Sequence, residues 1–225
     1  MQSVVLEGAF YRYQAPLISF GLFSIFLVLF KYSSGKIEDL KRLILEPKFI
    51  LVIIFAVSFL STVLFLGNKM PLLIFKITQA STNIYGQQYQ MGLFLKQFYQ
   101  GKAIAATDIG AISYLADIKS LDLYGLGSIE VAKNKINNTF SRERAAQLVE
   151  TNDVKIAILY DRYFKDRLSA SWVKAGKWEI DNNIISGDDT SFYATESEEK
   201  NDLLKNLKTF SPQLPSNVSS TIYNQ

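Results

Sequence analysis

The chain has 225 residues, of which 48% are hydrophobic, and a formal net charge of +3. It contains no cysteine and no histidine, which excludes disulfides, thiol chemistry and the commonest zinc ligands and general base. Residues 1–76 hold eight basic and four acidic residues, whereas residues 77–225 are close to neutral, with sixteen basic and seventeen acidic ones. A near-neutral C-terminal part argues against nucleic acid as a partner, because nucleic-acid-binding domains usually present a basic face.

Two uncharged stretches near the N-terminus predict a membrane anchor. Residues 13–30 and 49–68 contain no charged side chain and are apolar around the whole helix. At about 1.5 Å per residue each stretch reaches roughly 27–30 Å, the thickness of a bilayer core. We therefore expect residues 1–76 to contain two transmembrane helices, in a multi-pass protein of the cell (inner) membrane.

The loop between the two predicted spans carries five basic residues, at positions 31, 36, 41, 42 and 48. Fewer basic residues flank the outer ends of the spans. By the positive-inside rule the loop then lies in the cytoplasm, and residues 77–225 form an extracytoplasmic domain. The expected partner of the N-terminal part is the lipid bilayer.

Residues 77–225 show the alternation of helical and strand patterns that is typical of an α/β domain. The first strand, helix and second strand have the spacing of a β–α–β unit with a right-handed crossover, which predicts a parallel, Rossmann-like sheet. In chain order the expected elements are a helix at 81–99, a strand at 102–106, a helix at 109–116, a strand at 120–126, a helix at 141–153, a strand at 154–161, strand-like segments on both sides of a turn at 181–183, a strand at 190–195, a helix at 197–210 and a loose tail at 217–225.

Asp108 and Asp122 are the leading candidates for a ligand site. Both lie at or near the ends of the first two predicted strands, and ligands of parallel α/β sheets bind beyond the carboxyl ends of the strands. Two carboxylates and the amides of Gly125 and Gly127 could hold sugar hydroxyls or a divalent cation. In the structural alternative Asp108 caps the next helix, Gly110 lets helix and strand approach, and the later glycines form a turn.

A phosphate site at this helix start is disfavoured, because an Asp cap places negative charge where the phosphate would bind. Further along the chain, Arg142 at a helix start is either solvated or meets an acidic partner. Asp161 and Arg162 end the strongest strand, as a second rim position or as an internal ion pair. Trp172 and Trp178 could stack on a sugar or lie at a membrane interface, and core packing is the alternative.

Part of the chain resembles a known class of enzymes. Residues 83–132, followed by VKIAILYD and TSFYA, carry the pattern D-x-G-A-x-x-Y from Asp108 to Tyr114 and the pattern L-D-L-x-G-L from Leu121 to Leu126. These segments resemble the extracytoplasmic C-terminal part of bacterial GT-C-class membrane glycosyltransferases, the group with protein O-mannosyltransferases and the aminoarabinose transferase of lipid A. The resemblance covers roughly residues 49–210. It implies a polyprenyl-phosphate sugar donor and a cell-envelope acceptor.

Enzymes of that class have many more spans and hold their catalytic carboxylate in the first extracytoplasmic loop. This chain shows neither feature, so the resemblance implies a C-terminal portion that shapes the acceptor side and is inactive alone. No catalytic residue carries over, and we expect no cofactor and no metal site. The alternative is a non-enzymatic, membrane-anchored binding or scaffold protein. The candidate residues of the ligand-binding rim are Asp108, Gly110, Tyr114, Asp122 and Arg142.

Overall fold

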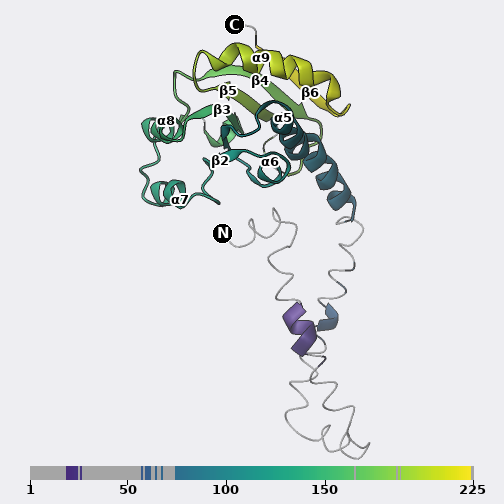
Figure 1. The fold of residues 1–225 in the computed structure, drawn as a ribbon. Coiled ribbons are helices and arrows are strands. Elements are labelled where there is room, and N and C mark those ends of the chain that lie inside the picture. Colours follow the sequence, from purple (N-terminus) through teal and green to yellow (C-terminus); the bar gives the residue numbers. More distant parts are fainter. Residues whose placement is uncertain are drawn as a thin grey trace, which may run out of the picture. The chain divides into compact units, whose positions relative to one another are not determined.

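The computed structural model describes residues 74–223 except 165, 186 and 188, together with residues 19–24, 26, 57, 59–61, 64 and 67 nearer the N-terminus. The chain divides into two compact units, Met1–Phe75 and Lys76–Gln225. The second unit contains an α/β fold built around one six-stranded sheet (Figure 1).

The structure contradicts the prediction of two transmembrane helices. Most of residues 13–30 and 49–68 lies outside the described part of the chain. Among the residues that are described, no helix combines the length and the apolar character that crossing a bilayer requires. The expectation rested on the run length of uncharged residues, whereas a span needs a continuous helix of about 20 residues.

The sheet is mixed, with strand order β2-β1-β3-β5-β4-β6, which corrects the expectation of a parallel, Rossmann-like sheet. Its first three strands pair in parallel, and they are β2 (Lys119–Asp122), β1 (Ala103–Ala106) and β3 (Val154–Leu159). The other pairings are antiparallel and add β5 (Asp189–Ala194), β4 (Val173–Ile180) and β6 (Val218–Ile222). Only a short loop joins β4 to β5, and a connection of that length permits antiparallel but not parallel pairing.

Helices cover both faces of the sheet. One face packs against α5 (Gln90–Phe98), α6 (Gly110–Leu115) and α9 (Glu199–Phe210), and the other against α7 (Ile129–Ile136) and α8 (Arg142–Thr151). Figure 1 shows α7 and α8 grouped apart from α5 and α9. The strands are buried on both sides because successive side chains point to opposite faces: Ile104 and Ala106 of β1 join the first core, and Ala105 joins the second.

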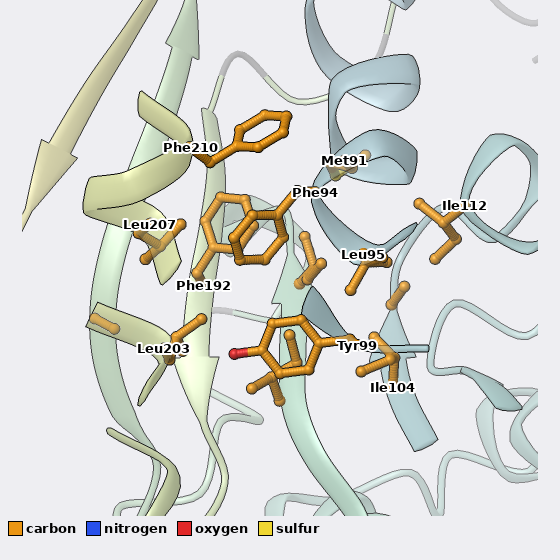
Figure 2. Packing of buried hydrophobic residues seen from close by; sticks show 14 of the residues in the cluster. Met91, Phe94, Leu95, Tyr99, Ile104, Ile112, Phe192, Leu203, Leu207 and Phe210 are labelled. Atoms are coloured by element: carbon orange, nitrogen blue, oxygen red, sulfur yellow. The ribbon is translucent and has the colours of Figure 1, made fainter. Parts of the chain in front are cut away.

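Phe94 of α5 is the centre of the larger core. It is fully buried, and its ring lies 5.5–5.7 Å, between centroids, from five other aromatic rings: those of Phe98, Tyr99, Trp178, Phe192 and Phe210. Figure 2 shows Phe94 with Tyr99, Phe192 and Phe210, together with Leu203 and Leu207 of α9. Aromatic pairs at such separations stabilise the fold beyond the burial of their area, so the cluster locks α5 and α9 onto β4 and β5.

Local sequence signals predicted some elements well and missed others. Ser141 caps α8 as expected, because its hydroxyl accepts the backbone N–H of Arg144. The expected strand at 120–126 ends early, at Asp122, and α7 was not predicted. The loose tail was a wrong prediction, since β6 pairs with Gly176–Ile180 of β4 along the edge of the sheet.

Candidate functional site

The three parallel strands β2, β1 and β3 end at one edge of the sheet, here called the carboxyl edge. From β1 the chain passes to α6 on one face, whereas from β2 it passes to α7 on the other. Adjacent strands whose connections diverge to opposite faces mark the place at which doubly wound sheets bind ligands. The side chains that follow these strands are therefore the first candidates for a site.

The helix that precedes β1 brings two glutamines to this edge. Within residues 74–98 the helix widens into a π-helical segment, η1 (Tyr85–Tyr89). Gln87 is 1% exposed and Gln88 is 5% exposed, although both are polar. Single π-helical turns occur frequently at functional sites, where they re-aim side chains that a regular helix would turn away.

The two glutamines join Tyr160 and Asp108 in what we call the Gln–Tyr–Asp network. The Gln88 Nε2 lies 3.1 Å from the Tyr160 Oη and 3.3 Å from the Asp108 Oδ2. The Tyr160 hydroxyl lies 3.3 Å from the Gln87 Oε1, and the Gln87 Nε2 donates to the carbonyl of Gly187 at 2.9 Å. Since each member constrains the next, the network is arranged before any ligand arrives.

Asp108 is the half-buried, solvent-facing end of this network. Its Oδ1 lies 3.5 Å from the backbone N of Gly110, too long for a strong helix cap, and no side chain caps α6. An ionised carboxylate offers about four acceptor positions. With one long contact to Gly110 and one to Gln88, Asp108 keeps acceptor positions for a ligand.

Asp122 has a different role. It is 3% exposed, and its two oxygens accept the backbone N–H groups of Tyr124 at 2.7 Å, Gly125 at 2.9 Å and Gly127 at 2.5 Å. Gly125 has a φ of 95°, which side-chain-bearing residues rarely adopt. The carboxylate therefore holds the loop after β2 in place and does not face a ligand.

This loop carries one member of a row of tyrosines. The rings of Tyr124 and Tyr163 lie 5.4 Å apart, and those of Tyr163 and Tyr160 lie 6.1 Å apart. Tyr124 is 38% exposed and Tyr163 is 37% exposed, whereas Tyr160 is buried. We call Tyr124, Tyr163 and Tyr160 the tyrosine row. Sequence analysis missed it, although Tyr160 lies in the strongest predicted strand, 154–161, and Tyr163 follows that strand closely.

The remaining candidates are not part of this arrangement. Tyr114 on α6 is 89% exposed, and Arg142 is an exposed residue at the start of α8, on the opposite face of the sheet. Among the described residues, no hydrogen bond or ion pair joins either side chain to Asp108 or Asp122. The close approach of helix and strand expected at Gly110 is not seen, because an added Cβ there would lie 3.8 Å from the Asp108 Oδ1. A close approach of two helices occurs at Gly92 of α5, where an added Cβ would lie 2.6 Å from the Cδ1 of Leu115 in α6.

Asp161, at the end of β3, forms a second polar cluster. Its carboxylate accepts the Lys174 ammonium at 2.5 Å, the Ser191 hydroxyl at 2.9 Å and the Tyr193 hydroxyl at 2.8 Å. Burial is the main cause that raises the pKa of Tyr193 above its ordinary value, and the neighbouring carboxylate raises it further. The internal ion pair thus forms with Lys174, while Arg162 lies over the ring of Tyr163.

Two other groups considered from the sequence are buried. Trp178 is 1% exposed in the aromatic core, and Trp172 is 9% exposed against the second core. Within the described part of the chain, no three histidine, cysteine, aspartate or glutamate residues come together as a metal site would need. The chemistry at the carboxyl edge consists of amides, phenols and one available carboxylate.

The fold and the carboxyl edge define an α/β domain whose parallel half is doubly wound. More specifically, the chain belongs to the family described as a domain of unknown function, DUF8728, whose model matches residues 82–194, half of the chain. The matched region runs from the helix that carries Gln87 and Gln88 to the end of β5, so it contains the whole carboxyl edge. No curated protein and no solved structure matches the chain.

Proposed function

We propose that this domain binds a saccharide at the carboxyl edge of its sheet. The observation that carries the proposal is the juxtaposition of two half-exposed rings, Tyr124 and Tyr163, with a buried polar network that ends in Asp108. A sugar ring presents hydroxyl groups around its rim and an apolar C–H face. Aromatic rings suit the apolar face, and groups that accept and donate hydrogen bonds suit the rim.

Preorganisation supports this assignment. The Tyr160 hydroxyl and the Gln88 amide are held by their contacts with Gln87, which is itself bonded to the backbone of Gly187. Side chains that are already immobilised lose little conformational entropy when a ligand binds. A network of this kind favours the recognition of a polar ligand of defined shape.

Binding is better supported than catalysis by these residues. General acid–base chemistry on a glycosidic bond uses two carboxyl groups that face the reacting atoms. At this edge Asp122 is engaged with three backbone N–H groups and Asp161 with three side chains, so Asp108 is the remaining carboxylate of the three. The resemblance to GT-C glycosyltransferases is consistent with a domain that presents the acceptor saccharide to an active site elsewhere.

The test is a titration of the full chain with a panel of neutral mono- and disaccharides, in which binding is measured by isothermal titration calorimetry or by NMR chemical-shift changes. We expect at least one saccharide to bind, and Asp108→Asn to weaken it by about tenfold, since a hydrogen bond to a charged group is worth about 1.5–3 kcal/mol. Tyr163→Ala removes the apolar ring under the sugar and should also weaken binding. Tyr114→Ala, which removes an exposed tyrosine outside the network, is the control and leaves the affinity unchanged.

Two outcomes would contradict the proposal. One is a panel in which no saccharide shifts the resonances of the carboxyl edge. The other is binding that Tyr114→Ala abolishes and Asp108→Asn leaves intact, because the saccharide would then lie on the exposed side of α6.

A further inference from the structure

Three cationic side chains lie over aromatic rings beside the tyrosine row. The Lys135 Nζ lies 4.6 Å from the centroid of the Tyr124 ring, and the Arg162 guanidinium lies 4.8 Å from that of Tyr163. The Phe140 ring has Lys135 at 5.3 Å and the Arg167 guanidinium at 5.8 Å. Two cations therefore share one ring next to the exposed tyrosines.

These cations have no direct ion-pair partner: among the described residues, no ion pair includes Lys135, Arg162 or Arg167. The Lys135 Nζ donates to the carbonyl of Tyr124 at 2.8 Å, which uses one of its three donors. Burial, followed by the nearby Arg167, lowers the pKa of Lys135.

The carboxylate of Asp122 is near enough to Lys135 to favour its charged form, yet its oxygens are taken by the backbone of the loop after β2. Arg162 donates to the Tyr163 hydroxyl at 2.8 Å. Lys135 and Arg167 consequently remain as two neighbouring cations with donors to spare. Such a pair is unfavourable alone, and a bound anion would neutralise it.

The cations extend the proposed saccharide site in one direction. Ring contacts lead from Tyr160 in the Gln–Tyr–Asp network to Tyr163 and on to Tyr124, and the Tyr124 ring then meets Lys135. One end of this line is a carboxylate with amides, its middle is aromatic, and its other end is cationic. That order matches a sugar ring with a negatively charged substituent.

We infer that the saccharide bound at the carboxyl edge is anionic, and that Lys135 and Arg167 bind its charged group, a phosphate ester or a uronate carboxylate. This inference rests on the proposed saccharide site. The planar guanidinium of Arg167 can donate two parallel hydrogen bonds to either group, whereas the ammonium of Lys135 acts as a point charge.

The test compares matched ligands on the full chain at low salt: glucose, mannose and galactose, each with its 1-phosphate and its uronate, and inorganic phosphate alone. For at least one sugar we expect an anionic member to bind about tenfold more tightly than the neutral one. Lys135→Gln and Arg167→Gln should each remove most of that preference for the anionic member. Lys133→Gln, an exposed lysine of the same helix, is the control.

The outcomes separate the two proposals. Equal binding of neutral and anionic sugars would overturn the anionic ligand and leave the saccharide site standing, whereas binding of no sugar would overturn both. Inorganic phosphate that binds as tightly as the sugar phosphates would also overturn the inference, because the cations would then form an anion site unrelated to the tyrosine row. If Lys135→Gln unfolds the protein, the variant Arg167→Gln, at an exposed position, still shows whether the preference for the anionic sugar depends on these cations.

Discussion

The parallel and the antiparallel halves of the sheet treat polar groups in different ways. The antiparallel strands carry the aromatic core, and their Lys174, Ser191 and Tyr193 engage the carboxylate of Asp161, which follows β3. In the parallel half Asp108 and the exposed tyrosines end at the carboxyl edge with part of their surface available. The difference indicates that the antiparallel half supports the fold and the parallel half carries the function.

A row of hydrogen bonds joins the helix before β1 to the antiparallel half. Along this helix Gln79, Asn83 and Gln87 are spaced four residues apart on one side, and each bonds to the loop between β4 and β5. The Gln79 Nε2 donates to the Asn182 carbonyl at 2.7 Å, the Asn83 Oδ1 accepts the Ile184 N–H at 3.1 Å, and Gln87 reaches Gly187. Because Gln87 also belongs to the Gln–Tyr–Asp network, the antiparallel half holds the candidate site in position.

The largest expected effect on stability comes from a substitution in the aromatic core. Phe94→Ala removes a fully buried ring from the centre of five aromatic contacts, and truncations of this kind cost about 3–5 kcal/mol. The free energy of unfolding, measured by urea denaturation, should fall by that amount. Leu126→Ala, at a position that is 87% exposed after β2, should change it by less than about 0.5 kcal/mol. Similar losses for both variants would refute the assignment of the core.

A second experiment compares Asp161, which side chains of the antiparallel strands engage, with Asp108, which they do not. Asp161→Ala leaves a partly buried ammonium and two hydroxyls without their acceptor, so we expect a loss of about 2–3 kcal/mol. Asp108→Ala should cost less than about 1 kcal/mol, because its contacts are long and half exposed. Paired urea titrations measure both values. If Asp108→Ala proved the more destabilising of the two, the available carboxylate would have to be reassigned as structural.

The smallest expected effect appears at alkaline pH. Burial is the main cause that raises the pKa of Tyr99 in the folded chain. The neutral phenol stabilises the fold fully below the unfolded pKa of about 10, and this contribution is lost as the pH rises toward the folded pKa. By pH 10.5 the loss from Tyr99 alone should reach roughly 0.8 kcal/mol. Urea midpoints of wild type and Tyr99→Phe between pH 8 and 10.5 measure it, and parallel curves would contradict the expected ionisation.

The sequence predicted more of the parallel half than of the antiparallel half. The runs at 102–106 and 154–161 are short and apolar, and Ser141 sits where a helix cap is expected, so local patterns sufficed for β1, β3 and α8. The tail at 217–225 looked loose because alternating small polar residues carry little local signal. Its strand forms only because β4 offers an unpaired edge.

The candidate site shows the same division. Asp108 could be named from its place after an apolar strand. The use of Asp122 by a loop could not be decided, since a strand-end carboxylate looks the same in sequence whether it faces a ligand or backbone amides. Tyr160 lies within the predicted strand and Tyr163 just after it, yet their contacts with Gln88 and Tyr124 join segments about 40 to 70 positions apart in the chain.

By itself the sequence determined the absence of thiol and imidazole chemistry, the α/β class of residues 77–225 and the order of most helices and strands, because these follow from composition and from short-range periodicity. Only the tertiary structure decided the mixed order of the strands, the partners of the three carboxylates and the assembly of the tyrosine row. Each of these depends on pairing between distant segments, whose free energy comes from packing and hydrogen bonds that no local pattern records.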